Sequence, residues 1–147
     1  MKNAHERIRV DFWQQKFNAF LKDARFREFK WGDYDCVMAA TACIDLLTGS
    51  DYVAQAKERY PYTTEAEARE WMAKIGGITG LVSSFLGDPI NWGALHIGDI
   101  VLVKAVPLVT EMEMLCIHDG VQLLAPASGG GLVRIPFQFA IHGWRVG

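Results

Sequence analysis

The fold of this chain is decided by the stretch WGDYDCVMAATACIDLLTG at residues 31–49. Asp35 precedes a run without glycine or proline, and its carboxylate is suited to accept the backbone N–H groups that the first turn of a helix leaves unpaired. Gly49 supplies a residue that adopts positive φ just past the helix end. The run is apolar nearly all round, which is typical of a helix buried on several sides. We therefore expect a central helix that begins at Cys36 and ends at Thr48.

The position of Cys36 in the first helical turn makes its thiol a candidate nucleophile. A helix N-terminus carries partial positive charge, which stabilises a thiolate and can lower the pKa of a cysteine from about 8.5 to about 3.5–7.5. Asp33 and Asp35 act in the opposite direction, because we expect them to cap the helix near the thiol, where their negative charge raises its pKa. A small buried thiol is also an ordinary core residue. Position alone leaves both roles open for Cys36.

Composition predicts one globular domain spanning residues 1–147. Half of the 147 residues are hydrophobic, which is enough for a single large core. The 15 basic and 17 acidic residues give a net charge of -2, so the chain lacks the electrostatic footprint of a protein that binds nucleic acid or an anionic membrane. No stretch approaches the roughly 18 apolar residues that a membrane span requires, and the amino terminus has no apolar signal core. We expect synthesis as a soluble cytosolic protein.

The three cysteines give no sign of a disulfide framework or a metal site. They lack CxxC spacing and lie in apolar segments: Cys36, Cys43 and Cys116. We expect reduced thiols, no bound metal and no cofactor.

The glycine run at residues 129–131 lacks the strand-to-helix setting and the lysine of a phosphate loop, so it predicts a flexible turn. The pair Glu111 and Glu113 is interpreted as a solvated edge rather than a catalytic carboxylate pair.

The first half of the chain has helical periodicity. Apolar residues recur three or four apart across residues 10–29, which predicts an amphipathic helix. Residues 51–62 are polar and predict a loop with at most a short helical turn. Thr64 and Glu67 form a capping-box pattern that predicts a helix ending at residue 75, with a further short helix across residues 78–86.

The pattern changes to short apolar runs after residue 97. An Asp-Gly pair at residues 119–120 separates two of them and predicts a β-hairpin. The expected strands cover residues 100–103, 115–118, 121–124 and 132–135, with an edge strand across residues 142–146. We therefore predict an α+β fold, in which amino-terminal helices pack on a carboxy-terminal antiparallel sheet whose inner face contacts the Cys36 helix.

This order of elements resembles the NlpC-type cell-wall cysteine peptidases, a compact branch of the papain-like fold. The resemblance rests on the Asp-Cys helix start and on the GDIVL strand at residues 98–102. It implies that Cys36 occupies the position of the nucleophile. The family's base histidine falls at Met114, and the residue that orients that histidine falls at Leu123 or Leu124, so both partner positions are apolar here.

A closer resemblance covers almost the whole chain. The chain resembles a small uncharacterised family encoded in phage and prophage tail modules, beside tail-tip and baseplate-hub genes, where related tails carry an NlpC-type peptidase. The order and spacing of modest motifs carry it: residues 29–36, 47–51, Tyr60 with Thr63, 76–77, 98–102, Gly120 and 144–146. It implies a virion tail-tip component with other tail-tip and hub proteins as partners, made in the host cytoplasm.

Cysteine attack on an amide needs a base near the thiol, and the chain has four histidines that could serve as one. His118 is the best candidate, because it shares a strand face with Met114. At about 3.3 Å per residue it would lie about 13 Å along the strand from Met114, which requires a shifted register. The favoured interpretation is a partly exposed hairpin histidine paired with Asp119. The remaining three are expected at the surface or in packing: His5, His96 and His142.

Three functions follow from these observations. The first is a structural tail-tip protein on a degenerate cysteine-peptidase scaffold, and the apolar residues at both partner positions favour it. The second is an active peptidoglycan endopeptidase that assists genome delivery, with Cys36 as nucleophile and His118 as base. The third is an assembly factor that is absent from the finished particle.

Overall fold

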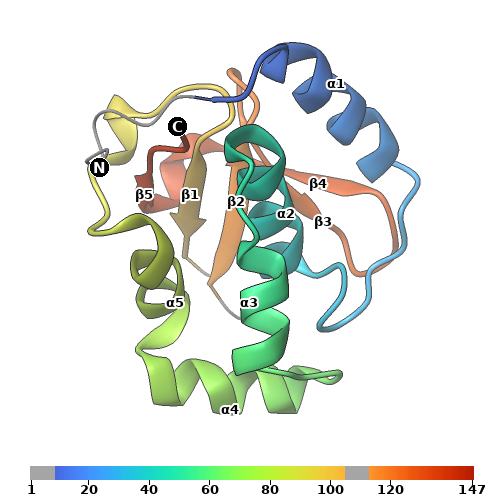
Figure 1. Ribbon diagram of the computed structural model, residues 1–147, viewed down its shortest axis with the longest axis vertical. Helices are drawn as coiled ribbons and strands as arrows, with labels where there is room; N and C mark the ends of the chain where they lie inside the picture. The colour runs from blue at the N-terminus through green and yellow to red at the C-terminus, as the bar shows by residue number, and fades with distance from the viewer. Residues whose placement is uncertain (1–8, 105–112) are drawn as a thin grey trace.

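The computed structural model describes residues 9–104 and 113–147, in which five α-helices precede a five-stranded antiparallel sheet. The mixed α+β class with the sheet in the carboxy-terminal half is therefore confirmed (Figure 1). The helices are α1 (Trp13–Ala24), α2 (Cys36–Thr48), α3 (Tyr52–Arg59), α4 (Glu65–Ile75) and α5 (Gly77–Leu86). The strands are β1 (Ile100–Val103), β2 (Met114–His118), β3 (Leu123–Pro126), β4 (Leu132–Ile135) and β5 (Ala140–Trp144), with 3₁₀ turns η1 (Trp92–Ala94) and η2 (Phe137–Phe139).

Helix α2 lies where the sequence predicts it. Asp35 is its N-cap and accepts a hydrogen bond from the backbone N–H of Met38 at 2.8 Å. Gly49 ends the helix with a φ of 73°, a conformation that glycine adopts without steric cost. Helices α1 and α3 flank α2, and the sheet lies behind it (Figure 1). Because α1, α3 and the sheet surround α2, side chains on nearly all sides of this helix are apolar.

The strand order β4-β3-β2-β1-β5 makes β5 an edge strand, as predicted. The predicted hairpin joins β2 to β3, but β3 begins at Leu123 and not at residue 121. The reason is the side chain of Asp119, whose Oδ1 accepts the backbone N–H groups of Val121 at 2.8 Å and Gln122 at 2.7 Å. These bonds hold residues 119–122 in a turn and remove residue 121 from the ladder.

The three central strands β1, β2 and β3 are buried on both faces of the sheet. One face packs on α2, and its side chains belong to a core cluster that includes Ile44 and Leu47 together with Ile100, Leu102, Leu115 and Ile117. Alternate strand residues point the other way and form a second cluster: Val101, Val103, Met114, Cys116, Leu123, Ala125 and Ile135. Trp92 of η1 and Phe137 of η2 stack over this second cluster with ring centroids 5.5 Å apart.

Helix α1 is shorter than the predicted 10–29. Val10 does not join the helix, because its backbone N–H donates to the carbonyl of Leu47 at 2.8 Å and ties the segment to the end of α2. Phe12 then takes a left-handed φ of 59° before the helix begins. Tertiary contacts with α2 therefore set the start of α1, and local periodicity does not reveal them.

Helix α3 replaces the loop predicted for this region. Its first N–H groups, from Tyr52 and Val53, are bound by the Asp45 carboxylate at 2.8 and 3.0 Å. The cap therefore comes from the last turn of α2, whereas Asp51, at the N-cap position of α3, makes no capping bond with its side chain.

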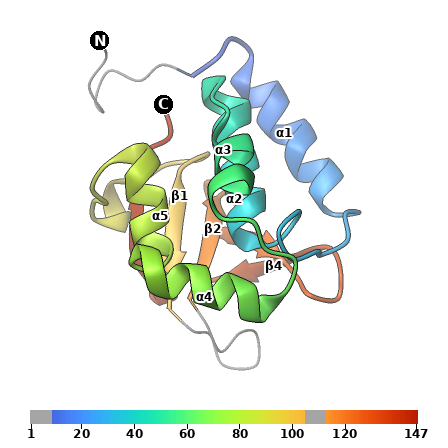
Figure 2. The ribbon, with the colours of Figure 1, turned by 60° about the horizontal axis from the view of Figure 1, so that its bottom comes forward.

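Helices α4 and α5 follow the predicted pattern. The hydroxyl of Thr64 accepts the N–H of Glu67 at 3.2 Å, and the Glu67 carboxylate returns to the N–H of Thr63 at 3.1 Å. In a standard capping box the Glu67 carboxylate would accept the N–H of the N-cap residue Thr64, but here it accepts the N–H of the preceding residue. Gly76, with a φ of 86°, ends α4 and leads directly into α5. Figure 2 shows α4 running across one end of the molecule between α3 and α5.

Candidate functional site

The candidate site is built around the Asp35 carboxylate, which is 1% exposed and binds three donors. Its Oδ1 accepts the N–H of Met38 at 2.8 Å, as an N-cap does. Its Oδ2 accepts the N–H of Gly32 at 2.9 Å and the hydroxyl of Tyr62 at 2.6 Å. The carboxylate therefore neutralises the positive end of α2 immediately beside the Cys36 thiol.

The Cys36 thiol has a pKa raised to about 12. Burial of the sulfur is the main cause, because a thiolate loses its hydration there, and the negative charge of Asp35 adds to it. Backbone hydrogen bonds from Leu115 and Val37 act in the opposite direction but do not offset these effects. The residue keeps intermediate solvent exposure. The raised pKa nevertheless favours the neutral thiol over the thiolate at physiological pH.

Tyr62 belongs to this site, although it was predicted only as part of a loop. Its pKa is raised by burial, by the charge of Asp35 and by the hydrogen bond that its hydroxyl donates to Asp35. A Cβ added to Gly32 would overlap the backbone carbonyl of Tyr62, and Gly32 has a φ of 79°. Only glycine therefore permits this close approach. No local sequence signal links the residue 62 segment to the start of α2.

Asp33 does not cap α2, so the prediction that it does so is wrong. Its carboxylate is exposed and forms an ion pair with Lys57 of α3 at 3.1 Å. This partner lowers the pKa of Asp33. The caps of a helix are set by backbone direction, and Asp35 already holds the position from which a side chain reaches the first N–H groups.

Strand β2 provides the surface that Cys36 faces. Cys36 packs against both core clusters, one of which contains Met114 and Cys116. The charge of a Cys36 thiolate would raise the pKa of Cys116, which places the two sulfurs in one apolar neighbourhood. Met114, at the position expected for a catalytic base, is buried and has no titratable group. Its thioether cannot accept the proton of the thiol in a catalytic cycle.

His118 lies at the opposite end of β2 from Met114. Its Nδ1 accepts the N–H of Gly120 at 3.0 Å, and its ring packs on Phe137 with centroids 5.0 Å apart. Burial lowers its pKa, while the nearby carboxylates of Asp99 and Asp119 oppose that shift. Cys36 is not among the groups that perturb His118. Within the described residues, the structure does not bring this histidine to the thiol.

The expected pairing of His118 with Asp119 is also wrong in detail. The imidazole is only 7% exposed, and the Asp119 carboxylate is engaged by the turn amides of Val121 and Gln122. The turn requires Asp119 as an acceptor, so its side chain is directed into its own loop.

The other histidines lie elsewhere. His96 is exposed, and His142 Nε2 lies 3.0 Å from the hydroxyl of Thr79, with its ring against Trp144. His5 and Glu111 lie outside the described residues.

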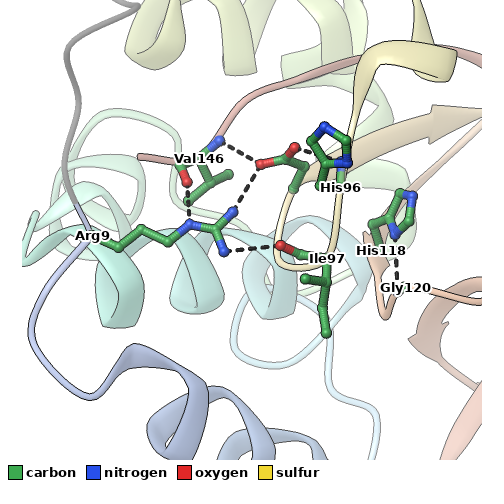
Figure 3. A network of polar contacts seen from close by, with 7 residues as sticks. Arg9, His96, Ile97, His118, Gly120 and Val146 are labelled. Atoms are coloured by element: carbon green, nitrogen blue, oxygen red, sulfur yellow. Dashed lines mark hydrogen bonds and ion pairs between the residues drawn. The ribbon is translucent and has the colours of Figure 1, made fainter.

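A second polar cluster, which the sequence did not predict, joins the two ends of the described chain (Figure 3). Arg9 donates to the carbonyls of Val146 at 2.6 Å and Ile97 at 2.9 Å and pairs with Asp99 at 3.0 Å. Asp99 in turn accepts the N–H groups of Val146 at 2.9 Å and His96 at 2.8 Å. Each charge is satisfied by several partners, so this cluster acts as a structural clasp.

A family profile matches residues 8–146, almost the whole chain. The chain belongs to the DUF6950 family. That family is described as a domain of unknown function. No curated protein and no solved structure matches this DUF6950 chain.

Across residues 9–104 and 113–147, no group of three or more His, Cys, Asp or Glu side chains is placed to hold a metal ion. In the same residues, no helix has the length and apolar character needed to span a bilayer. What the Asp35 site offers is a buried carboxylate, a neutral thiol and a tyrosine hydroxyl, which together stabilise a helix start.

Proposed function

We propose that the chain is a structural component of a bacteriophage or prophage tail tip, in the baseplate hub region. We further propose that its scaffold is a degenerate cysteine peptidase of the NlpC type. A helix that opens with Cys36, followed by the Gly98-Asp99 strand and further antiparallel strands, supports the scaffold assignment. The resemblance of the motifs at residues 29–36 and 98–102 to a phage tail-module family supports the tail-tip assignment.

One observation carries the non-catalytic part of this proposal. The Cys36 thiol, with its pKa raised to about 12, packs beside a cluster that contains Met114 at the position of the missing base. A peptidase of this type needs a thiolate at neutral pH and a base to transfer its proton. The position expected for the orienting group falls at Leu123 or Leu124. Both side chains are apolar, and both are buried. The site therefore favours packing over attack on an amide.

The alternative is an active peptidoglycan endopeptidase with Cys36 as nucleophile. It is supported by the position of Cys36 at a helix N-terminus and by the part of the residue that solvent reaches. This alternative requires His118, or a group from a neighbouring protein, to approach the thiol. Peptidoglycan would then be its substrate.

The structural role predicts where the protein is found. It is synthesised in the host cytoplasm and is then incorporated into the virion tail tip with other hub proteins. Mass spectrometry of purified particles tests this prediction. Peptides from this chain in particles of stable stoichiometry support a virion component, whereas their absence from infectious particles contradicts it and favours an assembly factor.

Genetic tests separate the structural role from the enzymatic one. In a phage that encodes this protein, deletion of the gene is expected to abolish plaque formation and to leave incomplete tails in electron micrographs. The Cys36→Ala substitution is expected to keep the plaque count within about threefold of wild type, because small apolar exchanges at one site cost little. Cys43→Ala serves as the matched control for loss of a core thiol. A loss of infectivity confined to Cys36→Ala, with tails intact and the protein folded, would support the peptidase instead.

A further inference from the structure

A groove of about 570 Å³ lies between α1 and the outer strands of the sheet. Its apolar surface comes from Leu21 of α1, Leu124 of β3 and Leu132 of β4. Leu124 pairs with Arg134 across the β3–β4 ladder, so the side chains of both residues point toward the same face of the sheet. Helix α2 covers the centre of that face, and the groove is the part that α2 leaves open.

Positive charge is concentrated on this groove. Lys22, Arg25 and Arg134 line it, and each of them is exposed. Among the described residues, the ion pairs found involve other cations: Arg9 with Asp99, Lys57 with Asp33 and Arg69 with Glu65. The chain as a whole has a net charge of -2, so the groove differs in sign from the protein that carries it.

The groove lining holds one carboxylate, that of Asp119. Its Oδ1 already accepts the backbone N–H groups of Val121 at 2.8 Å and Gln122 at 2.7 Å. Asp119 is therefore already engaged by the turn that it stabilises. Three cationic side chains and one carboxylate line the groove, so its net charge is positive.

Large apolar side chains lie exposed beside the groove. Phe26 is 83% exposed and follows Arg25, whose guanidinium carbon lies 5.9 Å from the phenyl centroid. Val121 is 79% exposed, and its backbone is bonded to Asp119 in the groove lining. Exposed apolar groups around a charged depression are typical of a surface that another protein covers.

We propose that the α1–β4 groove binds an acidic segment of a partner protein. Carboxylates of that segment pair with Lys22, Arg25 and Arg134. Its apolar side chains pack on Phe26 and on the three leucines that line the groove, which are Leu21, Leu124 and Leu132. The apolar floor favours a peptide over a nucleic acid, whose backbone is charged throughout. The proposal does not depend on the phage assignment, because it rests only on the charges and shape of this chain.

A random twelve-residue peptide library displayed on phage, panned against the full chain, tests the proposal. Enriched peptides are expected to be rich in Asp and Glu and to include apolar residues. The most enriched peptide is then synthesised with a fluorescent label, and its binding is measured by anisotropy at low and physiological salt. Affinity is expected to fall as salt rises, because exposed charges are screened. Enrichment of neutral or basic peptides, or no enrichment, overturns the proposal.

Charge reversal locates the binding site. The double variant Arg25→Glu/Arg134→Glu is expected to weaken peptide binding by about tenfold or more, since two favourable charge contacts become repulsive. The matched control Lys16→Glu/Arg59→Glu makes the same change in net charge at exposed residues outside the groove, and it is expected to stay within about twofold of wild type. Equal losses in both variants would mean non-specific attraction and overturn the proposal.

Two competing occupants are tested in the same series. A labelled twenty-residue oligo-dT that binds more tightly than the acidic peptide, with the same loss in Arg25→Glu/Arg134→Glu, would assign the groove to nucleic acid and overturn the proposal. Sedimentation velocity shows whether a second copy occupies the groove. Self-association of the wild type that this variant abolishes would overturn the proposal in favour of a homodimer. A wild-type monomer that binds the acidic peptide supports it.

Discussion

The hydroxyl of Tyr62 donates a 2.6 Å hydrogen bond to the same carboxylate, that of Asp35, whose other oxygen caps α2. This relationship fixes the chemistry at the start of the helix. The Asp35 carboxylate is held by a tyrosine hydroxyl, a glycine N–H and a helix N–H. Burial, together with the charge of this carboxylate, raises the pKa of the neighbouring Cys36 thiol.

The Asp35→Ala substitution is expected to lower the free energy of unfolding by about 2–4 kcal/mol, because it leaves two backbone N–H groups and the Tyr62 hydroxyl without their acceptor. Urea unfolding followed by circular dichroism measures the change. Asp33→Ala is the matched control and should cost less than about 1 kcal/mol, since its ion pair with Lys57 is exposed. Similar losses in the two variants would contradict the assignment of Asp35 as the cap.

Cys36 is expected to alkylate slowly at pH 7, with a rate that is still rising above pH 9, because its pKa is raised to about 12. Iodoacetamide labelling against pH, read by mass spectrometry, gives this profile. An unfolded control in urea should titrate near the ordinary cysteine pKa of about 8.5. Reactivity of the folded protein that persists below pH 7 would indicate a thiolate and would support the peptidase.

Gly32→Ala is expected to destabilise the fold by about 1–3 kcal/mol from its positive φ, with a further loss from the overlap of the new Cβ with the Tyr62 carbonyl. Thermal unfolding checks the result. Gly129→Ala provides the control, because no atom lies within 4 Å of a Cβ at that position. It should change stability by less than about 0.5 kcal/mol. A wild-type melting temperature for Gly32→Ala would show that residue 62 does not approach this turn.

Arg9→Ala should destabilise the protein by about 3–5 kcal/mol, because it leaves the Asp99 carboxylate buried without its counter-charge. Arg69→Ala, which removes an exposed i,i+4 pair with Glu65, is the control and should cost less than about 0.5 kcal/mol. Denaturant unfolding separates the two. A loss of unfolding free energy in Arg9→Ala as small as that in the control would mean that this cluster does not stabilise the contact between Arg9 and Val146.

His118 predicts a loss of stability in acid. Its pKa is lowered in the folded state, so the unfolded chain binds the proton more readily. The stabilisation is therefore complete above the unfolded pKa of about 6.5 and is lost as pH falls through the lower folded pKa. His118→Asn keeps an acceptor for the Gly120 N–H but does not titrate, so the fall in unfolding free energy between pH 7 and pH 5 should be smaller. A fall of the same size in His118→Asn and in the wild type would contradict this assignment.

Local signals predicted the elements whose ends are held by their own residues. Asp35 and Gly49 bound α2, Thr64 begins α4, and the Asp-Gly pair at residues 119–120 forms the hairpin turn. In each case a side chain or a glycine within a few residues satisfies the backbone groups concerned. The β strands were likewise predicted, because short runs rich in β-branched and apolar residues between turn residues are typical of strands.

Where distant residues hold the end of an element, the element was missed, as for α3, or its bounds were misplaced, as for α1. Helix α3 is capped by Asp45 from within α2, and the start of α1 is set by the bond from Val10 to Leu47. The candidate site shows the same division. The sequence identified Cys36 and Asp35 as neighbours, but it gave no sign that Tyr62 completes the carboxylate's hydrogen bonds.

The sequence by itself determined the α+β class and the position of the central helix. These properties depend on periodicity, caps and residue identity, which are local. Only the tertiary structure decided the raised pKa of Cys36, the clasp between Arg9 and Asp99 and the cationic groove on α1 and β4. Burial and charge proximity depend on distances between residues far apart in the chain, and the folded packing alone sets those distances.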